Sequence, residues 1–128
     1  MSKNKLPNLK NLFSAWLPVI TWAGLMFYLS DQSSLPSFKI SVVNFLFVKT
    51  AHIFVYAVLF FLINRALKIN TKLNINFAWK LALVLTLTYA ISDEVHQSFI
   101  PNRFGTLRDV GYDMLGASLV ILRDLRYI

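Results

Sequence analysis

The chain has 128 residues, of which 56% are hydrophobic and only 15% are charged, and it contains no cysteine. Soluble domains carry about 25% charged residues, which argues against a water-soluble fold, and the missing thiol excludes disulfides and cysteine-based nucleophiles or metal sites. The net charge of +7 comes from basic residues that flank apolar runs, a pattern typical of membrane topology rather than of nucleic-acid binding. We therefore predict a single multi-pass domain, residues 1–128, in the cell membrane, with no nucleic-acid partner.

Four apolar runs are candidates for membrane spans. The first, residues 13–30, has no charged residue and the length of about 18 residues that a spanning helix needs. It exceeds the apolar core of a signal peptide, roughly 7–15 residues, so we expect an uncleaved span. The second covers residues 42–64 and is followed by a polar connector. The third covers residues 77–99 and is stopped by Pro101, which cannot continue helical hydrogen bonding. The fourth, residues 107–122, is the shortest.

These runs predict an all-α membrane fold, an antiparallel bundle of four transmembrane helices, because backbone groups in lipid must be satisfied within each helix. Lys and Arg are enriched on the cytoplasmic side. Three lie in the N-terminal tail (Lys3, Lys5 and Lys10), three in the connector after the second span and two at the C-terminus, whereas the two other connectors hold one each. Both termini are therefore predicted to be cytoplasmic.

Most of the acidic residues lie between residues 89 and 116. This stretch holds four of the six carboxylates: Asp93, Glu94, Asp109 and Asp113. Charged groups at membrane depth are costly and usually serve a function. In the predicted orientation all four fall in the outer half of the bundle, so we expect the site to face outward.

The second span carries a polar stripe. Lys49, His52 and Tyr56 are spaced three and four residues apart, which places them on one face of a helix. At 1.5 Å per residue, Lys49 and His52 lie about 10–15 Å below the start of the span. Asp113 lies roughly 8 Å deeper than Arg108, which is close to the outer surface, by the same count. The depths overlap, so the stripe is expected to contact the carboxylates.

An anion-binding site is the first interpretation of this cluster. Lys49, Arg103 and Arg108 together suit a phosphate, since Arg supplies paired donors, and the apolar bundle suits a lipid tail. His52 or Glu94 is then the candidate general acid or base. Asp109 completes the polar core, and we count these three as candidate catalytic residues.

Two further chemical interpretations remain open. The first is a metal site made of His52, His96, Glu94 and Asp109, which are suitable ligand types. Their spacing matches no established metal signature, so we expect neither a metal nor a cofactor. The second is a proton or ion path along the carboxylates, as in transporters, for which four short spans would have to form a homo-oligomer.

The charges can also be purely structural. The pairs considered are Lys49 with Glu94, Arg108 with Asp93, and Arg103 with Asp31. Buried ion pairs are weak evidence for stability, because desolvation offsets much of the attraction, and a bundle can pack on small residues alone. Other polar residues are expected to support the site by hydrogen bonding: Tyr56, Asp93, Gln97 and Asp113. His96 is expected to be interfacial and solvated.

The assembled residues resemble the VanZ-like family of small bacterial membrane proteins. The first element of the family pattern, Lys-x-x-His-x-x-x-Tyr, corresponds to Lys49, His52 and Tyr56. The second, Asp-Glu-x-x-Gln-x-Phe-x-Pro-x-Arg, corresponds to Asp93, Glu94, Gln97, Phe99, Pro101 and Arg103. The third corresponds to Asp109 and Gly116. Asp113 stands where the family usually has Asn, and Asn102 where Gly is common.

The resemblance implies a link to the cell envelope, since the family's namesake is associated with resistance to the glycopeptide teicoplanin. Our leading hypothesis is an outward-facing site that binds an anionic, lipid-linked cell-envelope molecule. The alternative is a non-enzymatic interaction protein that alters wall assembly or drug access through a partner, with the charges as structural ion pairs. A small transporter is third.

Overall fold

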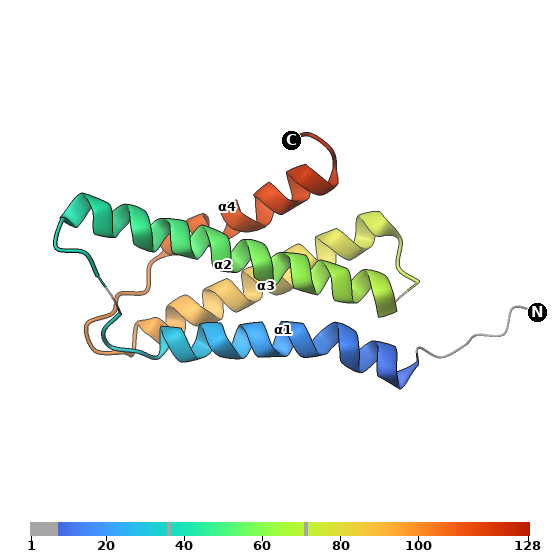
Figure 1. Ribbon diagram of the computed structural model, residues 1–128, viewed down its shortest axis with the longest axis horizontal. Coiled ribbons are helices and arrows are strands. Elements are labelled where there is room, and N and C mark those ends of the chain that lie inside the picture. Colours follow the sequence, from blue (N-terminus) through green and yellow to red (C-terminus); the bar gives the residue numbers. More distant parts are fainter. Residues whose placement is uncertain (1–7, 36, 71) are drawn as a thin grey trace, which may run out of the picture.

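The computed structural model describes residues 8–35, 37–70 and 72–128, and these residues form helices and no strand. The helices are α1 (Leu9–Ser30), α2 (Ser41–Asn70), α3 (Ile75–Gln97) and α4 (Leu107–Asp124). Successive helices run in opposite directions in an elongated bundle (Figure 1). The all-helical prediction is confirmed. Lys3 and Lys5, on which the predicted position of the N-terminus partly depends, lie outside the described residues.

Three of the four helices, α1, α2 and α3, are long and apolar enough to cross a membrane. Their outer faces carry large apolar side chains that are more than half exposed, including Phe13, Ile20 and Phe54. A contiguous apolar surface of this kind is unfavourable in water, whereas hydrocarbon tails accommodate it. The chain is therefore a membrane protein.

Helix α4 differs from the other three. It has 18 residues, five of them charged, and it is not among the helices apolar enough to span a membrane by composition. Its buried face consists of Asp109, Val110, Asp113, Gly116 and Ala117, a spacing that forms one stripe on a helix. Its position therefore depends on packing against the bundle, and its crossing of the membrane stays a prediction.

Helix α2 extends further than the predicted second span. It continues to Asn70, although a polar connector was expected from Arg65 onward. Ala66 and Leu67 are buried while Arg65 and Lys68 are exposed. This segment is amphipathic, and its apolar face packs on the bundle and keeps it helical. Helix α3 begins and ends two residues earlier than its predicted span.

Helix α2 is the centre of the bundle. It contacts α1, α3 and α4, and α4 most extensively, while α1 and α4 do not meet within the described chain. Helix α3 faces its neighbours with small side chains one turn apart, Ala78, Ala82, Thr86 and Ala90, all of them fully buried. Small residues let membrane helices approach closely.

Two hydrogen bonds from aromatic side chains connect α1 to its neighbours. Trp22 Nε1 donates to the carbonyl oxygen of Val55 at 2.9 Å, and the Tyr89 hydroxyl donates to that of Ala23 at 2.7 Å. Helix α1 is therefore held to α2 by one bond and to α3 by the other.

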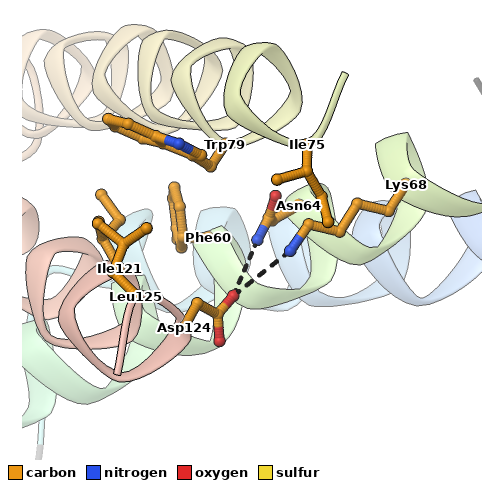
Figure 2. Close-up of a pocket in the computed structure, with 8 residues that line it drawn as sticks. All are labelled: Phe60, Asn64, Lys68, Ile75, Trp79, Ile121, Asp124 and Leu125. Atoms are coloured by element: carbon orange, nitrogen blue, oxygen red, sulfur yellow. Dashed lines mark hydrogen bonds and ion pairs between the residues drawn. The ribbon is translucent and has the colours of Figure 1, made fainter. Parts of the chain in front are cut away.

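The α1–α2 and α3–α4 connections lie together at one end of the bundle, which we call the site end, and the α2–α3 connection lies at the opposite end (Figure 1). At the opposite end, Asp124 ties α4 to α2 (Figure 2): its Oδ2 accepts from Asn64 Nδ2 at 3.2 Å and lies 3.6 Å from Lys68 Nζ. Phe60 and Trp79 line the adjoining cavity of about 70 Å³. The C-terminal half of α4 is fixed by these contacts.

Gly116 marks the closest approach of α4 to α2, because a Cβ at this position would overlap the carbonyl oxygen of Ile53. We expect Gly116→Ala to push the two helices apart and to lower the melting temperature in detergent. Gly111→Ala is the matched control, since a Cβ there meets nothing within 4 Å. Alanine favours a helix over glycine by about 1 kcal/mol, so this control should melt at or above the wild-type temperature. Equal melting temperatures would contradict the close crossing.

Candidate functional site

The polar stripe of α2 meets the carboxylates of α3 and α4 at the site end. Each member contacts a different aspartate: Lys49 with Asp109, His52 with Asp113, and Tyr56 with Asp93. His52 Nδ1 lies 2.8 Å from Asp113 Oδ1, and the Tyr56 hydroxyl donates to Asp93 Oδ2 at 3.1 Å. The contact expected from spacing and depth is therefore present.

The individual partners differ from those considered from the sequence. Lys49 pairs with Asp109 rather than Glu94. Asp31 pairs with His96, whose Nε2 lies 3.1 Å from Asp31 Oδ1, and the His96 ring lies 4.7 Å from that of Phe27. His96 is thus partly exposed, which is compatible with the expected interfacial position, but it is paired with Asp31. Depth estimates place residues along a helix, but they do not give the rotation of each helix, which selects the partner.

The two arginines have no partner of this kind. Neither Arg103 nor Arg108 makes a side-chain hydrogen bond or ion pair with any residue that the structure describes. Arg108 is exposed and Arg103 is partly exposed. The pairs considered for them, with Asp31 and Asp93, do not form. Both guanidinium groups are therefore available to a ligand.

Glu94 joins the end of α3 to the start of α4. Its Oε2 accepts a hydrogen bond from the backbone N–H of Thr106 at 2.8 Å. Thr106 in turn caps α4, since its Oγ1 accepts from the backbone N–H of Asp109 at 3.2 Å. Gly105 allows this approach, because a Cβ there would overlap the carbonyl oxygen of Glu94. Thr106 was missed in the sequence, although a threonine directly before a helix is a recognised capping signal.

The turn between α3 and α4 places Arg103. Helix α3 ends at Gln97, four residues before Pro101. Asn102 adopts a φ of 63°, a left-handed conformation that glycine and asparagine accept most readily. This explains in physical terms why Asn102 can stand where the VanZ-like pattern commonly has glycine.

Three buried carboxylate oxygens are unsatisfied. Asp93 Oδ1, Glu94 Oε1 and Asp113 Oδ2 have no hydrogen-bond partner in the described part of the chain. Asp93 accepts at its other oxygen from Gln97 Nε2 at 3.3 Å. Buried polar atoms are normally paired. The site therefore has unused capacity for a cation or a hydrogen-bond donor.

Ligand atoms from three of these residues lie close together. One atom each from His52, Glu94 and Asp113 falls within 4.8 Å of the others. The set considered from the sequence is not gathered, because His96 is paired with Asp31 and Asp109 with Lys49. Asp113, expected only to support the site, takes their place.

A groove of about 180 Å³ opens beside Glu94, between α3 and α4. Its lining combines polar and apolar side chains. The polar side chains are Glu94, Ser98 and Thr106, and the main apolar ones are Ile91, Val95 and Val110. Ser98 and the apolar residues were not singled out in the sequence. No local motif distinguishes them from other lipid-facing positions.

The fold and the site together define a small helical membrane protein with a cluster of charged side chains buried at one end of its bundle. Residues 7–123 match the model of the VanZ/LLP1 family. The chain therefore belongs to the VanZ/LLP1 family, as the motifs predicted. No curated protein and no solved structure matches it.

The Tyr56 hydroxyl offers a direct test of the buried network. Tyr56 is 1% exposed, and Tyr56→Phe removes the hydrogen bond to Asp93. Losing a bond to a buried charged group costs about 1–3 kcal/mol, so the melting temperature in detergent should fall by several degrees. Tyr28→Phe is the control, because Tyr28 is 62% exposed and its hydroxyl has no partner in the described chain. A similar change in both variants would mean that the Tyr56–Asp93 bond contributes nothing.

Proposed function

We propose that the protein binds an anionic, lipid-linked cell-envelope molecule at an outward-facing site between α3 and α4. The observation that carries this proposal is that Arg103 and Arg108 have no side-chain partner among the described residues, while their sequence neighbours Gly105 and Leu107 line the groove next to Glu94. Arg103 belongs to the connection that borders the groove, and Arg108 to the first turn of α4.

The arginines supply the recognition of the anion. A guanidinium presents a planar set of donors that matches phosphate or carboxylate oxygens in pairs. An ion-paired arginine would have to break its internal contact before binding, whereas neither of these has one. In this proposal the two groups together bind a phosphate or pyrophosphate headgroup.

The groove would bind the remainder of the ligand, which we propose to be amphiphilic. Ile91, Val95 and Val110 form an apolar floor along the helices, suited to an acyl or prenyl chain. Glu94 Oε1 is buried without a partner in the described chain and can accept a hydrogen bond from a hydroxyl of the headgroup. A lipid-linked molecule with hydroxyls near its phosphate could contact both the apolar residues and Glu94.

The remaining site residues have assigned roles in this proposal. Lys49 is held by Asp109, and its Nζ lies 5.4 Å from the centroid of the Tyr112 ring, so an anion would compete with Asp109 for it. A reaction at the site would use His52 or Glu94 as acid or base, with Asp109 as the third catalytic candidate. The association of the family's namesake with teicoplanin resistance fits this location, since glycopeptides bind cell-wall precursors outside the membrane.

A second function, that of a non-enzymatic interaction protein, is favoured by a different observation. Lys49, His52 and His96 are each paired with a carboxylate of another helix. In this second function, the paired side chains have a purely structural role and hold the helices of the bundle together. The chain would then act on wall assembly or drug access through a partner protein bound on its surface.

Native mass spectrometry of gently purified protein separates the two functions. We expect the wild type to carry a phosphorylated lipid and Arg103→Ala/Arg108→Ala to retain at least about tenfold less, because each contact to a charged group is worth about 1.5–3 kcal/mol. The control is Lys10→Ala/Arg65→Ala, which removes two exposed basic side chains at the opposite end. Lipid retained by the arginine variant, or absent from the wild type, would instead support the interaction protein.

The outward orientation can be tested separately, because the chain has no native cysteine. Phe104 is 83% exposed at the site end and Tyr127 is 76% exposed near the C-terminus. We expect Phe104→Cys to react with a membrane-impermeant thiol reagent in intact cells, and Tyr127→Cys only after permeabilisation. The reverse pattern would place the site on the cytoplasmic side and remove the basis for an envelope ligand.

A further inference from the structure

We infer that His52, Glu94 and Asp113 form a binding site for a divalent first-row metal ion. The three residues come from α2, α3 and α4, and one ligand atom of each lies within 4.8 Å of the others. The site therefore sits where these three helices meet. It does not depend on the proposed lipid ligand and would stand if no lipid were bound.

Two of the three ligands show unused coordinating capacity. Glu94 is 6% and Asp113 0% exposed, and each keeps one buried oxygen without a hydrogen-bond partner among the described residues. A buried polar oxygen without a hydrogen-bond partner is unfavourable, even where the other oxygen of the same carboxylate is paired. A cation placed between them satisfies both at once.

The charge of the surroundings also favours a cation. The buried carboxylates at this end are Asp93, Glu94, Asp109 and Asp113. Lys49 is the one lysine or arginine that the structure pairs with any of them, and it is bound to Asp109. The cluster therefore carries more negative than positive charge in a region of low dielectric, where like charges repel most strongly.

Two atoms bound to one ion at about 2.0–2.1 Å lie at most about 4.2 Å apart, so ligand atoms within 4.8 Å of one another need a small side-chain movement to share one ion. His52 Nδ1 and Asp113 Oδ1 lie 2.8 Å apart, whereas neighbouring ligands of a tetrahedral ion with bonds of about 2.0–2.1 Å lie about 3.3–3.4 Å apart, so these two atoms would separate by about 0.5 Å to bind the ion. The ion would take the place of the proton that these two atoms share. Imidazole and carboxylate donors together suit Zn²⁺, Fe²⁺ or Mn²⁺, and the chain has no cysteine to select a softer ion.

Asp113 is a ligand that the VanZ-like pattern does not usually provide. The VanZ-like pattern usually has asparagine at this position, and an asparagine would offer a neutral oxygen in place of a carboxylate. Asp113→Asn is therefore a conservative test that keeps the shape of the side chain and removes one charge from the site.

The experiment uses full-length protein purified through a tag that contains no histidine, treated with EDTA and then titrated with Zn²⁺. We expect one Zn²⁺ per chain by elemental analysis. Calorimetry should show about 100-fold weaker binding for His52→Gln and about 10–100-fold weaker binding for Asp113→Asn, the scale seen when groups supporting a metal site are removed. His96→Gln is the matched control, because it removes the other histidine and should keep wild-type affinity.

Two results would overturn the inference. One is a wild-type stoichiometry far below one Zn²⁺ per chain, which would mean that protons rather than a metal neutralise the carboxylates. The other is equal binding by His52→Gln, Asp113→Asn and His96→Gln, which would place the ion elsewhere. Circular dichroism and size-exclusion chromatography check each variant, and if His52→Gln does not fold, the comparison of Asp113→Asn with His96→Gln decides.

Discussion

The structure depends on three side-chain contacts that α2 makes with its neighbours. Three polar side chains of α2 each contact a different aspartate on α3 or α4. Lys49 and His52 reach Asp109 and Asp113 on α4, and Tyr56 reaches Asp93 on α3. In a low-dielectric interior each of these carboxylates needs a donor or a counter-charge, so a shift or rotation of α2 would break all three contacts together. These three contacts therefore fix both the position of α2 along its axis and its rotation relative to α3 and α4.

Helix α4 is too polar to be stabilised by lipid contact alone, and its contacts with α2 hold it in place. Its N-terminal half presents Asp109 and Asp113 to α2, while its C-terminal half presents Gly116 and Ala117 and allows close packing. Asp124 then binds Asn64 and Lys68 at the opposite end. A short helix with five charged residues is thus held at both ends by α2 and in the middle by backbone contact.

The sequence predicted the helices and the polar face of α2, because both follow from local periodicity. Lys49, His52 and Tyr56 share a face in any helix, whatever surrounds it. It did not predict that Glu94 binds the backbone of Thr106 or that Asp113 replaces His96 beside His52. Those contacts depend on the rotation and crossing of three helices, which no spacing within one helix records. The extension of α2 to Asn70 was missed for a related reason, since Arg65 and Lys68 suggested a loop while the burial of Ala66 and Leu67 is a tertiary effect.

The charges of the site are separated by depth, and this limits how any anionic ligand can bind. Arg103 and Arg108 lie toward the surface, whereas Glu94 and Asp113 are buried. A phosphate at the arginines is attracted, but the carboxylates repel it if it moves deeper. In the proposed function the phosphate therefore stays at the arginines, and groups that donate hydrogen bonds face Glu94. A divalent ion at His52, Glu94 and Asp113 would reverse the deeper repulsion, so the proposed metal would decide how far an anionic headgroup can enter.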